Sequence, residues 1–263
     1  MSRTLSPYEK NHLSRWGIDP DSIDGYGEMP VEYITGHVTF SNHDLVVNQD
    51  VLIPRLETEE LVTFAMNSCR ELYRRHQREL DIVDVGTGSG ALGLSVSQGL
   101  THQHVPHQLV LSDVSEPALT IAATNTQRLF PTNANHITLI QSSLLTTISP
   151  AHTFDVILAN LPYIPQARLP ELASSVKNYE PTLALDGGED GLELIDELLR
   201  QIHQQHRLKP GGVIWLEVDH THPAAVFRKR HPQWEATALT DQFGQRRFIR
   251  LNQSISSDDS PAQ

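Results

Sequence analysis

The chain has 263 residues, 38% of them hydrophobic and 20% charged, which suits one globular domain with or without a small appendage. Its net charge of −12 argues against a protein that grips long stretches of nucleic-acid backbone. The single cysteine, Cys69, cannot form an internal disulfide, the polar N-terminus has no signal region, and no apolar run is long enough to span a membrane. We therefore expect a cytoplasmic protein without a membrane partner.

The first 56 residues predict a short helical segment followed by a hairpin. Ser6 as N-cap and Pro7 at the first helical position indicate a helix over 7–16, within an N-terminal segment 1–30 that is too short for a large core. Strand-like segments follow at Tyr33–Ile34, Val38–Phe40, Leu45–Val47 and Val51–Ile53. Because the break between residues 41 and 44 is rich in turn residues, we predict a β-hairpin linker over residues 31–56.

From residue 57 to residue 252 the pattern predicts one α/β domain. It begins with a helix over 58–78, and then strands and helices alternate. The short apolar runs that predict buried strands are Ile82–Val85, Leu109–Leu111, Ile137–Ile140, Val156–Ala159 and Val213–Leu216. The expected helices between them are 91–99, 116–129 and 192–206. This alternation indicates a mostly parallel sheet with helices on both faces.

The C-terminal end departs from this alternation. Residues 236–239 and 247–249 are separated by a turn and predict a hairpin that places an antiparallel strand in the sheet. The polar tail over 253–263 is expected to be disordered.

A glycine loop follows the first strand of the α/β domain and precedes a helix. It consists of Gly86, Thr87, Gly88, Ser89 and Gly90. Glycines let a ligand approach the main chain closely, and the N-terminus of the next helix supplies free N–H groups for a carboxylate or a phosphate. The loop therefore predicts a cofactor site.

Asp113 ends the second strand of the domain and supports a nucleoside cofactor. At that place in a doubly wound sheet, a carboxylate faces the crevice and can accept both hydroxyls of a ribose. NAD and S-adenosylmethionine both carry such a ribose, so Asp113 does not choose between them; it could also cap the next helix. Glu217, at the end of a later strand, is left open between a place near the cofactor and a structural role.

The tetrapeptide Asn160-Leu161-Pro162-Tyr163 follows the fourth strand and favours methyl transfer over hydride transfer. An amide NH2 is a poor nucleophile, so its lone pair must be aligned with the methyl donor. The Asn160 side-chain oxygen and the Leu161 carbonyl can accept its two hydrogens, because Pro162 holds Leu161 extended. Tyr163 can stack on the planar acceptor. The alternative is a strand-end turn with a buried tyrosine.

The order of these elements resembles the seven-stranded methyltransferases, and residues 160–163 resemble their Asn-x-Pro-Tyr motif for planar amino groups. Residues 33–36 with Phe40, and the stretch Leu-Ile-Pro-Arg-Leu-Glu-Thr-Glu-Glu-Leu-Val over 52–62, resemble the HemK/PrmC family of peptide chain release factor N(5)-glutamine methyltransferases. Further matching stretches are 180–181, 184–185, 187–192 and 209–212. The resemblance covers residues 30–252 and implies a seven-stranded Rossmann-like sheet, mostly parallel with one antiparallel strand.

The resemblance implies methyl transfer from S-adenosylmethionine to a glutamine side chain of a release factor. The residues expected to bind the cofactor are Gly86, Thr87, Gly88, Ser89, Gly90, Asp113, Val114, Ser143 and Asn160. The catalytic residues would be Asn160, Leu161, Pro162 and Tyr163, and Arg55 with Glu57 would shape the substrate pocket. Neither a metal nor a stable nucleic-acid partner is expected, and the oligomeric state is left open.

Three departures from the family pattern keep alternatives open. Leu161 stands where the family usually has a proline, and Asn-Leu-Pro-Tyr also resembles the motif of ribosomal-RNA adenine dimethyltransferases. Residues 142–143 are Ser-Ser where Gly-Asp is usual, and only about 30 residues precede Tyr33, fewer than in most members. The alternative function is an N(6)-adenine methyltransferase acting on RNA or DNA. A cofactor-binding scaffold and an NAD dehydrogenase are the remaining hypotheses.

Overall fold

The computed structural model describes residues 3–253. The elements before the main domain are α1 (Pro7–Arg15), η1 (Pro20–Ser22), η2 (Asp24–Tyr26), α2 (Val31–Thr35), β1 (His37–Phe40) and β2 (His43–Val46). The main domain contains α3 (Thr58–His76), β3 (Leu80–Val85), α4 (Ala91–His102), β4 (His107–Asp113), α5 (Glu116–Leu129), β5 (Ile137–Gln141), β6 (Phe154–Ala159), η3 (Gln166–Glu171), α6 (Ser174–Lys177), η4 (Thr182–Ala184), α7 (Glu193–Gln204), β7 (Leu208–Glu217), α8 (Ala224–Arg230), β8 (Trp234–Thr240) and β9 (Arg246–Gln253). No helix within residues 3–253 is long and apolar enough to cross a membrane.

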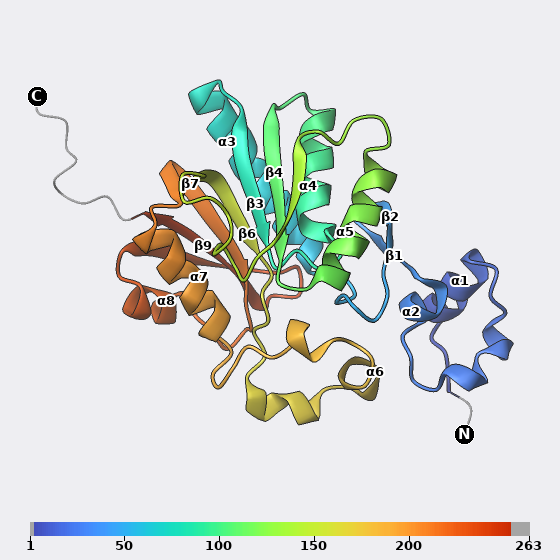
Figure 1. The fold of residues 1–263 in the computed structure, drawn as a ribbon. Coiled ribbons are helices and arrows are strands. Elements are labelled where there is room, and N and C mark those ends of the chain that lie inside the picture. Colours follow the sequence, from blue (N-terminus) through green and yellow to red (C-terminus); the bar gives the residue numbers. More distant parts are fainter. Residues whose placement is uncertain (1–2, 254–263) are drawn as a thin grey trace, which may run out of the picture.

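A seven-stranded sheet in the order β5-β4-β3-β6-β7-β9-β8 forms the centre of the molecule (Figure 1). The pairs from β5 to β7 are parallel, whereas β9 runs antiparallel to both of its neighbours. The predicted Rossmann-like sheet with one antiparallel strand is therefore confirmed. Because β3, β4 and β6 are adjacent and parallel, the loops that follow them meet at one edge of the sheet.

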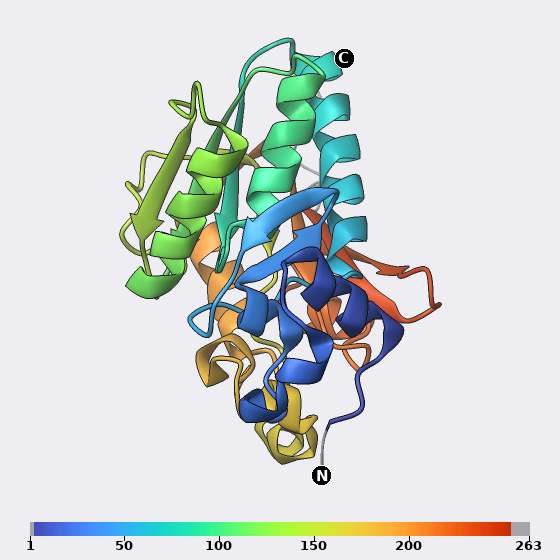
Figure 2. The same ribbon diagram turned by 90° about the vertical axis from the view of Figure 1, so that its right-hand side faces the viewer.

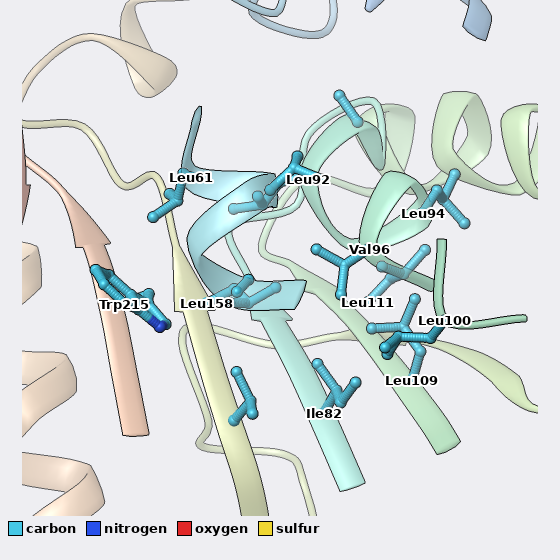
Figure 3. Packing of buried hydrophobic residues seen from close by; sticks show 14 of the residues in the cluster. Leu61, Ile82, Leu92, Leu94, Val96, Leu100, Leu109, Leu111, Leu158 and Trp215 are labelled. Atoms are coloured by element: carbon cyan, nitrogen blue, oxygen red, sulfur yellow. The ribbon is translucent and has the colours of Figure 1, made fainter. Parts of the chain in front are cut away.

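Alternating side chains of each inner strand fill two cores, one on each face of the sheet. On β3, Ile82 faces the core formed with α3, α4 and α5, while Val83 and Val85 face the core formed with α7 and α8. Figure 3 shows the first core, where Leu61 and Leu94 from the helices pack beside strand residues that include Leu158. Full burial of one such leucine contributes about 1.5–3 kcal/mol, so these cores fix the strand ends that carry the site.

The N-terminal segment has a small core of its own and packs on the hairpin (Figure 2). This core is formed by Leu13 and Ile23 of the segment and by Val31 of α2. The Trp16 ring stacks on His37 of β1 with a centroid separation of 3.6 Å. Figures 1 and 2 both show this segment at the same end of the sheet as α6, and the Tyr179 hydroxyl donates to the Tyr26 carbonyl oxygen. The N-terminal segment therefore contacts the segment that follows α6.

Asn125 of α5 joins the hairpin to the glycine loop. Its Oδ1 accepts from the Val46 N–H at 2.7 Å, and its Nδ2 donates to the carbonyl oxygens of Val46 and Ser89 at 3.0 and 2.8 Å. The buried Asn125 amide thus makes the pair of hydrogen bonds to Val46 that a neighbouring strand would make to β2. This contact fixes the hairpin relative to the loop that follows β3.

Two of the expected strands are absent, while the β1–β2 hairpin and the terminal hairpin are confirmed. Tyr33 and Ile34 lie in α2, because Pro30 precedes that helix and Gly36 ends it with a left-handed φ of 75°. Residues 51–53 form no strand: the Val51 carbonyl accepts from the Tyr33 hydroxyl, and the Ile53 N–H donates to Glu180. In the expected tail 253–263, residue 253 belongs to β9 and residues 254–263 lie outside the described residues.

Candidate active site

A cavity of about 400 Å³ lies where the loops after β3, β4 and β6 meet. Its polar lining includes Thr58, Asp84, Thr87, Gly88, Ser89, Asp113, Ser142, Ser143 and Asn160. Its other walls come from residues 49–52 and 54, from the stretch 160–162 and from residues 181, 183 and 184. A cavity at this edge of a doubly wound sheet is the usual place for a nucleoside ligand.

The glycine loop turns sharply because three of its residues have left-handed backbones. The φ angles are 71° at Gly86, 55° at Gly88 and 83° at Gly90. A Cβ on Gly86 would lie 2.7 Å from a Leu161 methyl carbon, whereas a Cβ on Gly88 would meet no atom within 4 Å. The loop is thus packed at its first glycine and open at its second. Gly90 is the N-cap residue of α4 and packs on Leu94 rather than lining the cavity.

Asp113 connects the glycine loop to the start of α5. Its Oδ2 accepts from the Gly88 N–H at 2.8 Å and its Oδ1 from the Ser115 N–H at 2.9 Å. The N-cap of α5 is Ser115, whose hydroxyl accepts from the Ala118 N–H, so Asp113 is not the cap itself. Burial raises the pKa of Asp113. The carboxyl group lies at the cavity wall, where a ribose would meet it.

Asp84 is a second buried carboxyl group beside the loop, and the sequence did not reveal its role. Its Oδ2 accepts from the Thr87 hydroxyl at 2.7 Å and from the Gly93 N–H at 2.9 Å. Burial raises the pKa of Asp84 to about 6, since neither donor carries a charge. Asp84 therefore holds the loop against the first turns of α4.

The tetrapeptide after β6 divides between the cavity and the core. Asn160 and Pro162 line the cavity, and the Asn160 Nδ2 donates to the Thr58 hydroxyl oxygen at 3.3 Å. Leu161 also contributes to the lining, although its side chain is only 4% exposed. Tyr163 is not among the lining residues, and its hydroxyl donates to Glu217 Oε1 at 3.1 Å. The structure thus brings Asn160, Leu161 and Pro162 to the same cavity as the glycine loop, and Tyr163 lies behind them.

Thr58 and Glu217 complete the polar surroundings of Asn160. The Thr58 hydroxyl donates to Glu217 Oε2 at 2.7 Å, and both side chains are buried. Burial raises the pKa of Glu217. Sequence reasoning did not assign Thr58, although it lies inside the matched stretch 52–62. The place of Glu217 at the end of β7, next to β6, was the available signal.

The other predicted residues lie around the rim of the cavity. Val114 and Ser143 are exposed and contribute to its lining. Arg55 is half-buried and pairs with the buried Glu180 at 2.6 Å, which ties residues 51–58 to the segment after α6. Glu57 is the N-cap residue of α3 without a side-chain capping bond. Arg55 and Glu57 are not lining residues themselves, so their substrate role stays a prediction.

This fold and cavity define a Rossmann-like methyltransferase, and residues 69–174 match the family model described as methyltransferase small domain. The solved hMettl16 catalytic domain in complex with MAT2A 3′UTR hairpin 6 shares the fold, with a TM-score of 0.61 and 13% identity over 82% of this chain and 77% of that chain.

Curated relatives identify the family. The release factor glutamine methyltransferase of Lactococcus lactis is 35% identical over 84% of this chain and 77% of its own length. That of Gloeobacter violaceus is 37% identical over 72% of this chain and 62% of its own length. The chain belongs to the family of release factor glutamine methyltransferases. It spans less than two thirds of the length of several of these relatives, including the Gloeobacter violaceus protein.

Proposed function

We propose that this chain transfers a methyl group from S-adenosylmethionine to the side-chain amide nitrogen of a glutamine in a peptide chain release factor. Family membership supports this function, and one geometric observation carries it: the glycine loop and Asp113 open into the same cavity as Asn160. Direct transfer requires the donor and the acceptor to meet in one enclosed space. Since release factors act in translation, we place the reaction in the cytoplasm.

The residues around the cavity fit the cofactor. Gly88 presents a bare backbone to open space, as a ligand that approaches the main chain requires. Residues 86–89 would hold its amino-acid part and Asp113 its ribose, with Val114 and Ser143 beside the rest of the nucleoside. When bound, the cofactor supplies an electrophilic methyl group on a sulfonium.

Asn160 and Leu161 would hold the acceptor amide. The Asn160 Oδ1 and the Leu161 carbonyl oxygen accept its two hydrogens, which aligns the nitrogen lone pair with the incoming methyl group. Pro162 favours the extended backbone that aims the Leu161 carbonyl. The extra proton on the methylated nitrogen then leaves to solvent. Stacking of Tyr163 on the acceptor remains part of the proposal.

Leu161 is weak support for the alternative of adenine methylation. Its side chain is almost fully buried and occupies the space beside Gly86, so it fills the core rather than a base-binding surface. A proline at this position would present the same backbone carbonyl. The net charge of −12 also disfavours a nucleic-acid substrate.

The test uses S-adenosylmethionine with a labelled methyl group, recombinant release factor and ribosomal RNA in separate reactions. We expect label on a glutamine of the release factor, mapped by mass spectrometry of its peptides. Asn160→Ala should lower kcat about 100-fold because the acceptor amide is no longer aligned. Asn67→Ala, on the exposed surface of α3, is the matched control and should keep full activity.

Two outcomes would overturn the proposal. Label on adenine in RNA, with none on the release factor, would favour the alternative methyltransferase. Equal turnover by the wild-type chain and Asn160→Ala would place catalysis elsewhere.

A further inference from the structure

Four side chains form one continuous hydrogen-bonded series that begins at the cavity wall, with Asn160 and Thr58, and continues behind it to Glu217 and Tyr163. The Asn160 Nδ2 donates to the Thr58 hydroxyl, and that hydroxyl donates to Glu217 Oε2. The Tyr163 hydroxyl donates to Glu217 Oε1. Glu217 therefore joins the first and last residues of the tetrapeptide, which lie on the loop after β6, to the first turn of α3.

The direction of these bonds follows from the number of hydrogens available. A threonine hydroxyl has one hydrogen, and an ionised carboxylate can only accept. Because Thr58 gives its hydrogen to Glu217, it can offer Asn160 only a lone pair. Asn160 must then turn its NH2 group toward Thr58, which leaves its Oδ1 free. An asparagine in the opposite orientation would place its NH2 group against the NH2 of an amide substrate.

Burial opposes the ionised form of Glu217 that this direction requires, whereas the two hydroxyl groups that donate to the carboxylate, those of Thr58 and Tyr163, favour that form. The positive charge of Arg247 lies close to Glu217 and opposes the effect of burial, which raises the pKa of the carboxyl group. Glu57 is the neighbouring negative charge and acts in the same sense as burial. Arg247 is itself held by Asp241, to which its Nε donates at 3.0 Å.

We propose that Glu217 and Thr58 are positioning residues that fix the orientation of the Asn160 amide, so that Oδ1 faces the methyl acceptor. This inference rests on the proposed function, since it assumes an acceptor with an NH2 group. Glu217 acts through Thr58 and Tyr163 and touches no substrate. Its substitution should therefore change turnover more than cofactor binding.

The kinetic test compares Thr58→Val, Thr58→Ser and Glu217→Gln with wild-type chain, using release factor and S-adenosylmethionine. Valine has the shape of threonine without a donor, and glutamine has one acceptor oxygen for two donors. We expect kcat to fall about 10- to 100-fold in Thr58→Val and Glu217→Gln, from the loss of one charge-assisted hydrogen bond. The Kd of the cofactor should stay unchanged, and Thr58→Ser should recover most of the turnover.

A second measurement does not depend on activity. In wild-type chain the Asn160 side-chain NH2 is bound to Thr58, so its hydrogens should exchange slowly in NMR spectra. In Thr58→Val they should exchange faster. Thr63→Val on the surface of α3 and Glu71→Gln in an exposed ion pair are the matched controls, and both should behave as wild type.

The results separate failure of this inference from failure of the proposed function. If wild-type chain methylates no glutamine in the release factor, the proposed function is wrong, and hydrogen exchange still decides the orientation of Asn160. If wild-type chain is active but Thr58→Val keeps its kcat, the positioning role is wrong. It is also wrong if Thr58→Ser loses as much as Thr58→Val, or if kcat falls only in proportion to cofactor binding and melting temperature.

Discussion

Both ends of the seven-stranded sheet bury carboxylates, but different donors surround them. At the amino ends, Asp155 of β6 accepts hydrogen bonds from two guanidinium nitrogens of Arg78 at 2.6 and 2.8 Å. It also accepts one from the Lys209 ammonium at 3.0 Å. Burial alone would raise the pKa of Asp155, yet these bonds lower it below its ordinary value. At the carboxyl ends, Asp84 and Asp113 meet only hydroxyl and backbone N–H donors, and burial raises the pKa of both.

The charged donors at the amino ends and the neutral donors at the carboxyl ends have different consequences for stability and for ligand binding. An ion pair with several hydrogen bonds compensates a buried charge, so the amino end holds strands together. Neutral donors compensate a buried charge less, so the carboxyl ends keep polar groups that can still form hydrogen bonds with a ligand. Substitutions at the two ends should consequently change different measured quantities.

The largest effect is expected for Asp113→Ala at the carboxyl end. Loss of the carboxylate removes hydrogen bonds to the ribose proposed to lie there, so the Kd of S-adenosylmethionine should rise about 10- to 100-fold. Isothermal titration calorimetry measures this directly. Glu116→Ala, an exposed acidic residue three positions further along, should bind as wild type. An unchanged Kd in Asp113→Ala would show that the carboxylate serves only the turn before α5.

Arg78→Gln at the amino end should lower stability and leave binding intact. It leaves Asp155 with Lys209 alone as a charged partner, which should reduce the free energy of unfolding by about 1–2 kcal/mol, a modest value because Arg78 is 41% exposed. Urea denaturation gives the change, with Arg74→Gln on exposed α3 surface as the control. The comparison between the two ends fails if Arg78→Gln weakens cofactor binding as much as Asp113→Ala does.

The fold and the strand-end residues could be predicted because they depend on local pattern. Buried strands appear as apolar runs, and parallel strands bring Gly86, Asp113 and Asn160 to one edge whatever else the chain contains. The strand prediction at Tyr33–Ile34 failed because Pro30 and Gly36 outweigh the β-propensity of the two residues between them.

The contacts that complete the site could not be predicted, since they join distant parts of the chain. Thr58 and Glu217 are 159 positions apart, and Asn125 and Val46 are 79 apart. Threonine, asparagine and glutamate at such places are common in caps and on surfaces. Only packing of α3 and α5 against the sheet reveals which of them are buried together.

The last effect concerns the pH dependence of stability set by Asp84. Its pKa is about 6 in the folded chain against an ordinary value of 3.8, so between these values the folded chain binds the proton more tightly than the unfolded chain. The contribution of Asp84 to stability is therefore complete below about pH 4 and is lost as pH rises through 6, with a slope of up to about 1.4 kcal/mol per pH unit.

Asp84→Asn does not titrate and keeps an oxygen for Thr87 and Gly93. The difference in unfolding free energy between wild-type chain and Asp84→Asn, measured in urea from pH 4.5 to 7.5, should change up to pH 6 and then level off. Subtraction cancels buried histidines such as His107, and Asp24→Asn on the exposed surface should give a flat difference. A flat line for Asp84→Asn as well would mean that the hydroxyl and N–H donors fully compensate the buried charge, and the two ends of the sheet would then differ in composition but not in energy.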